Sequence, residues 1–435
     1  MKFKIMLLAM IMLISFLLTS AHASIQNEPR IIQIGVFAGS NWNVPNSDSY
    51  AILDNAIRRF EKQFPNIKVV YRSGTLKDDY SEWLAQKILT GDEPDIFIVI
   101  PEDFVLFSSI GVLKNLDKLI QNDNDFNKDA YYTTAMQAGE YIGNQFALPF
   151  ETVPVLMFVN KTLLQTENIP IPKNDWTWND FYDICDKVTR DINGDGILDQ
   201  YGSYEFRWQD AVHTNSAVLF NAQGSKAFFN SNEVLDAIWF AKKVNSLSGN
   251  YRITSQDFDN GYVAFRPLPF SSYRAYKPYP YRIKKYSNFE WDCIKMPAGP
   301  NGDNASELHT LLYGMSNRTA NEKEAWEFIK FLTSDVVTQL EIFRYSHGVS
   351  VIKTVTESEE ASLILHEDIG IGENFINMKV LSEVIEQSIV PPKFPRYTGA
   401  MELADKELYQ VIHGERNHLT SLNLIQRQIT TYLNQ

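Results

Sequence analysis

The sequence predicts an α/β fold of two lobes, each a mostly parallel sheet flanked by helices. Apolar, β-branched runs alternate with segments of helical periodicity along most of the chain, a pattern typical of parallel sheets that are covered on both faces. The 435 residues exceed what one hydrophobic core organises. No low-complexity linker separates the two halves, so we expect ordered crossings between the lobes.

The alternation of strands and helices is regular in the first part of the chain. A strand over residues 31–37 precedes a helical pattern at 53–64, and a second strand follows at 67–71. A helix over residues 80–89 then leads to a fully apolar strand at 95–100. Open parallel sheets bind ligands outside the carboxyl ends of their strands, so two such sheets that face each other predict one cleft.

Strand and helix signals resume later in the chain. Residues 156–159 predict a strand, and Thr177 with Asp180 three residues later forms a capping-box pattern that begins a helix. Further helices are predicted through residues 234–241 and 321–332.

The first residues have the form of an export signal. Lys2 and Lys4 precede an apolar run at 5–18, and small residues at 21–23 frame a cleavage site. The run is shorter than the roughly 20 residues that a membrane-spanning helix needs. We therefore expect residues 1–23 to be a cleaved signal peptide and the protein to be exported to a periplasm or the cell exterior. No cysteine stands directly after the signal, so no lipid anchor is expected.

Charge and cysteine content argue against two other classes of protein. A net charge of −13 is the wrong sign for binding a phosphate backbone, so nucleic acid is not an expected partner. Two cysteines do not make a disulfide framework. Cys185 lies in a helical pattern and Cys293 in a strand pattern, and the sequence leaves open whether they pair or remain buried thiols.

Several motifs, in one order along the chain, resemble a known family. The chain is similar to the extracellular solute-binding proteins of ABC sugar transporters (family 1), the group that includes maltose-binding protein. The segments that carry this resemblance are Phe-Ala-Leu-Pro-Phe-Glu at 146–151, Val-Asn-Lys-Thr-Leu at 159–163, Trp-Thr-Trp-Asn-Asp-Phe at 176–181, Phe-Asp-Asn-Gly-Tyr-Val-Ala-Phe at 258–265, Met-Pro-Ala-Gly-Pro at 296–300, Ser-Asn at 316–317, and the helix at 323–332.

The resemblance implies a periplasmic-binding-protein-like fold in which two lobes are joined by a three-crossing hinge and close on a ligand. It also implies an oligosaccharide ligand, permease subunits of an ABC transporter as partners, and a monomer. The expected crossings lie near 141–149, 293–298 and 343–348. The expected first lobe comprises 24–145 and 297–345, and the second comprises 146–296 and 346–435. Phe265, where the family has Met, and the 270–273 region depart from the family pattern.

Sugar recognition needs an aromatic ring for the apolar face of the sugar and hydrogen-bonding groups for its hydroxyls. Trp42 follows the first strand, and the resemblance places it, with Asn41, at the cleft. The alternative is a loop tryptophan packed on its own lobe. Glu151 could accept two hydroxyl protons or be a solvated acid at the hinge. Trp208 and Tyr313 are further candidates, with core packing as the alternative.

A basic, aromatic tract spans residues 265–286. It holds six cations, five tyrosines and no acid in a chain of opposite net charge. Guanidinium groups bind carboxylates bidentately and tyrosine rings cover sugar faces, so this tract, with Arg266 and Tyr273, suggests an acidic oligosaccharide. A solvated basic face or a docking patch for the transporter is the alternative.

A loop rich in Asp, Asn and Gly resembles a calcium-binding loop. Oxygen ligands would come from Asp191, Asn193, Asp195 and Asp199 and from the carbonyl of Ile197, with a glycine that turns the loop. The twelfth position is glycine, so the bidentate glutamate of the full pattern is missing. We expect a structural Ca²⁺ at this loop, with an acidic turn as the alternative. No other cofactor is expected.

A secreted glycoside-active enzyme is the rival class. Glu151 with Asp210 or Asp95 could supply the two carboxylates that glycoside hydrolysis needs. Nothing in their spacing selects such a pair among 53 acidic residues, and no nucleophile or phosphate-binding motif is present. A surface adhesin would predict repeats or an anchor motif, and the sequence has neither. We therefore expect a binding protein and no catalytic residues.

Overall fold

The computed structural model describes residues 29–42, 44, 46, 48, 50–276, 289–367, 377–414 and 418–435. The predicted signal peptide lies outside these residues, and so do Lys277, Arg282, Lys284 and Lys285 of the basic tract. Within the described ranges, no helix is both long and apolar enough to cross a membrane.

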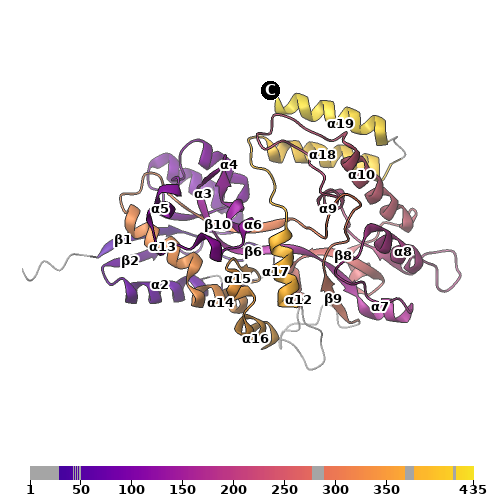
Figure 1. Ribbon diagram of the computed structural model, residues 1–435, viewed down its shortest axis with the longest axis horizontal. Helices are drawn as coiled ribbons and strands as arrows, with labels where there is room; N and C mark the ends of the chain where they lie inside the picture. The colour runs from indigo at the N-terminus through magenta and orange to yellow at the C-terminus, as the bar shows by residue number, and fades with distance from the viewer. Residues whose placement is uncertain are drawn as a thin grey trace, which may run out of the picture.

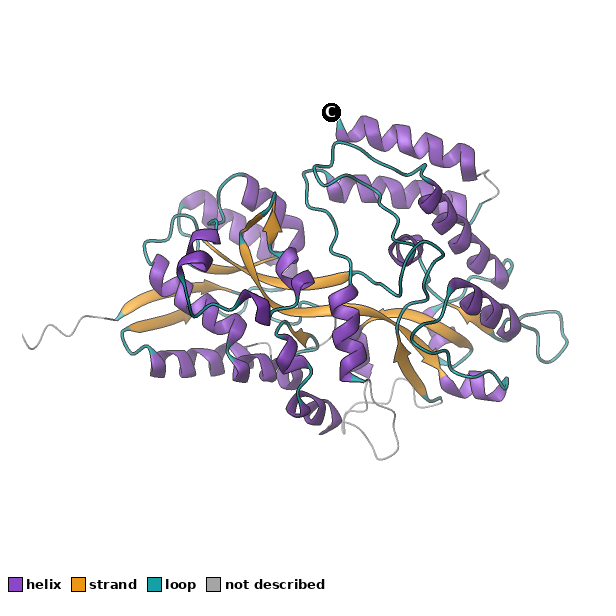
Figure 2. Ribbon diagram, viewed as in Figure 1, coloured by secondary structure: helices purple, strands orange, loops and turns teal. Residues whose placement is uncertain are grey.

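Two lobes lie side by side and share one sheet (Figures 1 and 2). In the described part of the chain, nine strands form this sheet in the order β2-β1-β3-β10-β6-β8-β7, with β9 and β11 also paired to β6. Helices cover the sheet in both lobes, which confirms the predicted α/β class.

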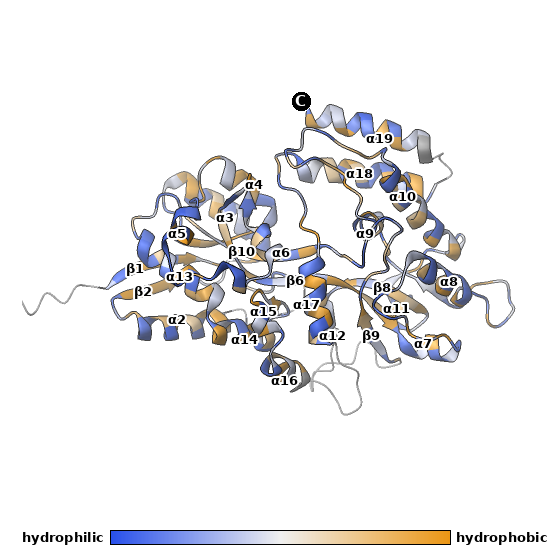
Figure 3. Cartoon of the chain, in the orientation of Figure 1, coloured by the Kyte–Doolittle hydropathy of each residue, from blue (hydrophilic) through white to orange (hydrophobic). Residues whose placement is uncertain are grey.

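The first lobe contains the parallel strands β2-β1-β3, and β10 runs antiparallel to β3. Helix α2 buries Ile52, Leu53, Ala56 and Phe60, one apolar stripe of an otherwise hydrophilic helix (Figure 3). The elements of this lobe are β1 (Arg30–Gly35), α2 (Ala51–Gln63), β2 (Ile67–Tyr71), α3 (Lys77–Thr90), β3 (Ile96–Val99), α4 (Pro101–Ser109), α5 (Asp117–Asn122), α6 (Thr133–Ala138), β4 (Glu140–Tyr141), β5 (Asn144–Gln145), β10 (Leu308–Met315), α13 (Glu322–Ser334) and α14 (Val336–Tyr345).

The second lobe is built on the end of β6 (Ala147–Asn160). This half of β6 pairs antiparallel with β8 and β9, and β7 runs parallel to β8. Helix α8 begins with the predicted capping box, in which the backbone N–H of Thr177 donates to Asp180 at 2.8 Å. The other elements are α7 (Lys161–Thr166), α8 (Trp178–Val188), β7 (Tyr201–Ser203), α9 (Trp208–Thr214), α10 (Asn232–Asn245), α11 (Ser255–Asp259), β8 (Val263–Pro269), α12 (Phe270–Tyr276), β9 (Trp291–Ile294), α18 (Tyr397–Ile412) and α19 (His418–Leu433).

The packing of the C-terminal segment differs from the expected division at residue 346. Helices α15 (Lys353–Thr356), α16 (Glu359–Glu367) and α17 (Met378–Gln387) pack against α14, α6 and one another, so they belong to the first lobe. Only α18 and α19 pack on α10 of the second lobe. The physical reason is the apolar stripe of α17, with buried Leu381, Val384 and Ile385, which the first lobe covers.

The observed crossings lie later in the chain than those expected at 141–149, 293–298 and 343–348. Strand β6 pairs with β10 up to Pro154 and with β8 from Val155, so it carries the first crossing. The second follows Ala298, which still bridges to Thr177. The third connects α17 to α18, and its Ile389 pairs with Glu307 of the second. Near 343–348 the chain stays in the first lobe, because Ser350 of β11 (Val349–Ser350) pairs with Glu151.

The two cysteines are buried and form no disulfide with each other. Cys185 belongs to the core of the second lobe, and Cys293 on β9 belongs to the larger cluster on the other side of the sheet. Of the two alternatives that the sequence left open, the structure therefore selects two separate thiols that pack as small apolar side chains.

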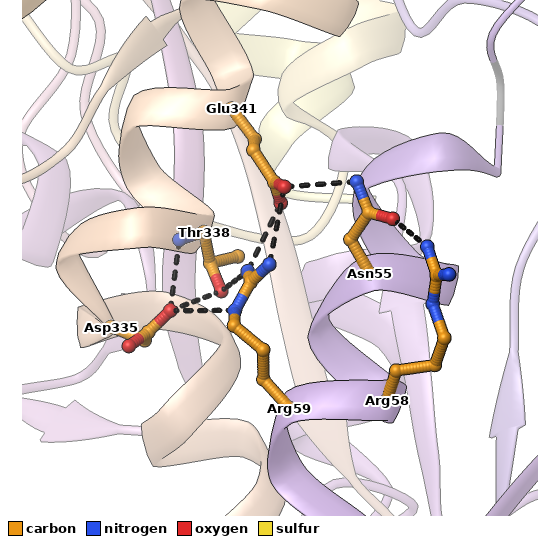
Figure 4. Close-up of polar contacts among 6 residues, drawn as sticks. All are labelled: Asn55, Arg58, Arg59, Asp335, Thr338 and Glu341. Carbon is orange, nitrogen blue, oxygen red and sulfur yellow. Dashed lines mark hydrogen bonds and ion pairs between the residues drawn. The ribbon is translucent and has the colours of Figure 1, made fainter.

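An ion-pair network fastens α2 to α14 (Figure 4). Arg59 of α2 donates to both Glu341 at 3.0 Å and Thr338 at 2.9 Å, and it forms an ion pair with Asp335. Asn55 donates to the same Glu341 carboxylate at 2.9 Å. Because α2 follows the loop after β1 and α14 precedes Ser346, the network fixes two segments that meet at Glu151.

Candidate ligand-binding site

The loop after β1 approaches the crossing strand through Trp42. The indole Nε1–H of Trp42 donates to Oε1 of Glu151 at 3.0 Å, and its backbone N–H donates to Ser40 Oγ at 3.0 Å. Lys77, at the first position of α3, donates to the backbone carbonyl of Asn41 at 2.6 Å. The loop is thus held from two sides.

Glu151 is buried where β6 begins to leave the first lobe. Its second oxygen accepts a hydrogen bond from Ser346 Oγ. Burial raises the pKa of the Glu151 carboxyl to about 7, although the hydrogen bonds from Ser346 and Trp42 and the nearby Arg274 all act in the opposite direction. A Cβ at Gly348 would lie 2.6 Å from this carboxylate, so only glycine permits the close approach of that segment.

A small cavity of about 60 Å³ adjoins Glu151 and is also lined by Asn41 and Tyr313. The Tyr313 ring is buried and meets Phe150 edge-on at 5.4 Å. This volume holds a few waters and no sugar ring. The structure therefore brings four predicted residues together, and within this group the Trp42 indole N–H and one Glu151 oxygen are paired with each other.

A larger cavity lies on the other face of β10. It measures about 480 Å³ and is bounded by α4, β10 and residues 390–398 of the third crossing. Its volume falls within the usual range of small-molecule sites. Aromatic and polar side chains alternate around it, in the combination that sugar binding requires. They are Phe104, Phe394 and Tyr397, together with Glu102, Glu307, His309, Lys393 and Arg396.

The cations of this cavity are held by the protein around them. The ammonium of Lys393 donates to the carbonyl of Gln137 at 2.8 Å and lies 5.8 Å from the centre of the Phe104 ring. Burial lowers the pKa of Lys393 to about 8, and Glu140 partly offsets that effect. Arg396 donates to the carbonyl of Tyr432 at 2.6 Å from a left-handed backbone conformation, φ +71°.

Two titratable groups of helix α9 in the second lobe interact electrostatically with Glu307 of this cavity. Asp210 caps α9 by accepting the backbone N–H of Arg207 at 2.8 Å. Burial raises the pKa of Asp210 to about 7, and the cavity residue Glu307 adds to the effect. Burial lowers the pKa of His213 on the same helix, while Glu307 opposes that shift. The cavity lining itself includes Tyr397 and Thr398 at the start of α18, so the site involves both lobes.

Three predicted ligand residues form hydrogen bonds or pack against rings within the second lobe. Trp208 is buried and its Nε1–H donates to Asp405 at 2.7 Å. Arg266 forms two hydrogen bonds to Glu205, at 2.9 and 2.7 Å, and is buried as well. Tyr273 is buried and stacks on Phe270 with ring centres 5.3 Å apart. Among the described residues, none of these three lines the cavities on either face of β10.

The Asp191–Asp199 loop is closed by its own hydrogen bonds. The Asp191 carboxylate accepts the N–H groups of Gly194 at 2.6 Å and Gly196 at 2.7 Å, which lowers the pKa of Asp191. Asp199 accepts the N–H of Ile192 at 2.7 Å. Among the described residues, no three His, Cys, Asp or Glu side chains are grouped as a metal site. Calcium binding stays a prediction, with Asp191, Asn193, Asp195, Asp199 and the Ile197 carbonyl as its donor set.

Sequence reasoning missed the rings that line the larger cavity. Phe104 lies in an ordinary amphipathic helix, and Phe394 lies in the Pro-Pro-Lys-Phe-Pro segment at 391–395. This segment has neither strand nor helix periodicity, so no pattern singled it out. Its three prolines within five residues are the one signal that an ordered, extended crossing was present.

Two α/β lobes joined by three crossings around an interlobe cavity define a two-lobed binding protein. A family model, described as bacterial extracellular solute-binding protein, matches residues 45–339, well over half of the chain. The chain belongs to this family, whose members bind solutes outside the cytoplasm. A maltotriose-binding protein of Pyrococcus abyssi is 25% identical over 123 residues, which is 28% of this chain and 26% of that protein.

Solved structures share the fold across nearly the whole chain. An ABC substrate-binding protein of Listeria monocytogenes in complex with cycloalternan aligns with a TM-score of 0.68 and 21% identity, covering 93% of this chain and 99% of its own. The sugar-binding protein of Xanthomonas citri gives 0.75 and 14%, covering 93% and 97%. A cyclic α-maltosyl-1,6-maltose binding protein of Arthrobacter globiformis gives 0.75 and 14%, covering 93% and 99%. These likenesses establish the fold.

Proposed function

We propose that the protein captures an oligosaccharide in the cavity between α4, β10 and residues 390–398 and delivers it to an ABC transporter. The observation that carries this proposal is the cavity itself, about 480 Å³ with three aromatic rings beside acidic, basic and imidazole groups. Rings cover the C–H faces of sugars, and the polar groups bond their hydroxyls. The sugar ligands named for the similar proteins support the same class of ligand.

Binding proceeds by hinge closure. Strand β6 belongs to the sheet of both lobes, so small backbone changes near Pro154 and in the other two crossings let one lobe rotate against the other. A ligand seated on Tyr397 gains further contacts with the opposite lobe only when the lobes approach. Because those contacts exist in the closed state alone, binding shifts the population toward it.

The arrangement of the carboxylates argues against the hydrolase alternative. Asp95 precedes β3 and accepts the N–H of Gln33 at 2.8 Å, at the opposite end of the strand from the cavity. Register across β10 separates Glu151 from Ile96 by four residues, or about 13 Å at the usual rise. Asp210 caps α9. A binding protein without turnover fits these roles.

Export and docking complete the proposed function. Lys2, Lys4 and the apolar run at 5–18 support a cleaved signal peptide, and the family supports a location outside the cytoplasm. Permease subunits of the transporter then recognise the closed, ligand-bound form.

A neutral oligosaccharide fits the described residues better than the acidic one that the basic tract suggested. Arg266 is neutralised by Glu205, and Arg274 donates to the carbonyl of Phe343. Matched neutral and uronate-containing oligosaccharides, titrated into wild type and Arg266→Ala, test the choice. Equal or better binding of the neutral sugar supports the proposal. Selective binding of the acidic sugar that Arg266→Ala abolishes would show instead that the basic tract at 265–286 contacts the ligand.

The test of the function as a whole is a thermal-shift screen against neutral oligosaccharides, followed by calorimetry with the best ligand. Ligand at 100 times its Kd raises the unfolding free energy by about 2.7 kcal/mol. Chromatography of the incubated ligand should show it intact. Steady release of shorter sugars would make the protein a hydrolase, and the absence of any stabilising sugar would reject the oligosaccharide class.

A further inference from the structure

A second aromatic site lies on the surface of the second lobe. A shallow groove of about 370 Å³ runs between α10, the start of α8 and residues 298–300. We call it the α10 groove and define it by Asn179, Asp236, Trp239, Phe240, Lys243 and Pro300. It shares no residue with the interlobe cavity.

The groove has a rigid floor and an exposed ring. Trp178 and Phe240 are buried and stack face to face, with ring centres 4.2 Å apart and planes at 2°. The Trp178 indole donates to Thr214 at 3.0 Å, and its backbone N–H donates to Ala298 at 2.9 Å. Next to this floor, Trp239 is 50% exposed. A tryptophan on such a floor loses little conformational freedom when a ligand covers it.

Hydrogen-bond donors and acceptors both border the Trp239 ring. Asp236, Trp239 and Lys243 follow each other at helical spacing along α10, so they share one face. Lys243 lies 3.5 Å from the centre of the Tyr182 ring and 5.6 Å from that of Trp239, which fixes its position. Within the described residues, Asn179 and Asp236 have no side-chain hydrogen bond or ion pair. The rim of the groove therefore offers a hydrogen-bond acceptor in Asp236, a donor in Lys243, and an amide in Asn179 that can both donate and accept.

This chemistry matches a sugar ring. A hydroxyl donates and accepts at once, so a polyol uses an acceptor, a donor and an amide together, while an anionic or cationic polymer would use only one sign. The exposed indole supplies the apolar face that a pyranose stacks on. We propose that the α10 groove is a surface carbohydrate site that holds one or two neutral sugar units, separate from the transport cavity.

Fluorine NMR of 5-fluorotryptophan-labelled protein tests this directly. The chain has eight tryptophans, and the resonance missing from Trp239→Ala identifies Trp239. Titration with maltotriose, xylotriose and mannotriose should move this resonance and saturate with a Kd on the order of 1 mM, or about −4 kcal/mol. Asp236→Ala should weaken that binding by about tenfold. Tyr409→Ala, an exposed aromatic on α18, should leave it unchanged.

The test separates this proposal from the transport cavity. In Tyr397→Ala, which alters the cavity, the Trp239 resonance should still respond to the same sugars. A Trp239 resonance that none of the three trisaccharides moves would overturn the proposal. So would a Trp239→Ala variant that binds sugars like wild type but supports less uptake through the permease, because the groove would then be a protein-docking face.

Discussion

The two faces of β10 carry chemically similar side chains in opposite states. On one face, Trp42 and Ser346 both donate to Glu151, which borders a cavity of about 60 Å³. On the other face, Phe394 and Tyr397 border about 480 Å³. An aromatic ring beside a carboxylate is therefore not in itself a sugar site. What matters is whether the groups have already satisfied each other.

The difference assigns separate roles to the two faces. The Trp42–Glu151–Ser346 contacts join the β1 loop, the crossing strand and the end of α14, so they stabilise the first lobe where β6 leaves it. On the opposite face Phe104 and Phe394 are buried and Tyr397 is partly exposed, so Tyr397 is the ring that a ligand can reach. Substitutions on the first face should change stability, and substitutions on the second should change affinity.

The largest expected effect is a pH-dependent stability that comes from Glu151. Its pKa rises on folding from 4.5 to about 7, so the folded state binds the proton more tightly and stability falls as pH rises through that window. The loss amounts to about 3 kcal/mol. Glu151→Gln stays neutral and should exceed wild type by about this amount at pH 8 and equal it at pH 4.

Urea unfolding of wild type and Glu151→Gln across this pH range measures the difference, in which the shifted titration of Asp210 cancels. Glu233→Gln, an exposed glutamate on α10, is the control and should follow wild type. Parallel curves for Glu151→Gln and wild type at every pH would contradict a buried, proton-binding Glu151.

The second effect concerns ligand affinity at the larger cavity, on the face of β10 that carries Tyr397. Tyr397→Ala removes a ring from the cavity, and the best oligosaccharide should bind about 30-fold more weakly, a loss of about 2 kcal/mol. Calorimetry gives the affinity. Tyr409→Ala removes an exposed ring from the same helix and should bind as wild type does. Equal affinities for Tyr397→Ala and Tyr409→Ala would show that the ligand binds outside this cavity.

Trp42→Phe is a milder change that tests the hydrogen bond between Trp42 and Glu151. Phenylalanine keeps a ring but cannot donate to Glu151, so one oxygen of a buried carboxyl loses its partner. The free energy of unfolding should fall by about 1–2 kcal/mol. Ligand affinity should stay within about threefold of wild type. A large loss of affinity at unchanged stability would show instead that Trp42 contacts the sugar.

The smallest expected effect is at the Asp191–Asp199 loop, far from both faces. Calcium at ten times its Kd should stabilise the wild type by about 1.4 kcal/mol relative to protein in chelator. Melting curves with chelator and with calcium measure this shift. Asp195→Ala should abolish it, because one donor of the predicted set is gone. The same calcium response in both proteins would exclude this loop.

The expected secondary structure is present where local patterns were strong, whereas the expected crossings differ from those observed because tertiary packing decides them. The strand at 67–71 and the capping box at Thr177 are present at the predicted residues. The third crossing was expected near 343–348 and lies between α17 and α18. The amphipathic sequence of a helix such as α17 predicts that one face is buried. It does not predict which lobe covers that face.

The sequence by itself determined the alternation of strands and helices, the family and the class of ligand to consider. These follow from periodicity and short motifs, which are local. Only the tertiary structure decided that Glu205 neutralises Arg266, that Glu151 engages Trp42, and that Tyr397 stays partly exposed at the larger cavity. The physical reason is that availability for a ligand depends on the partners that folding brings to each side chain, and these partners lie 61 and 109 residues away along the chain.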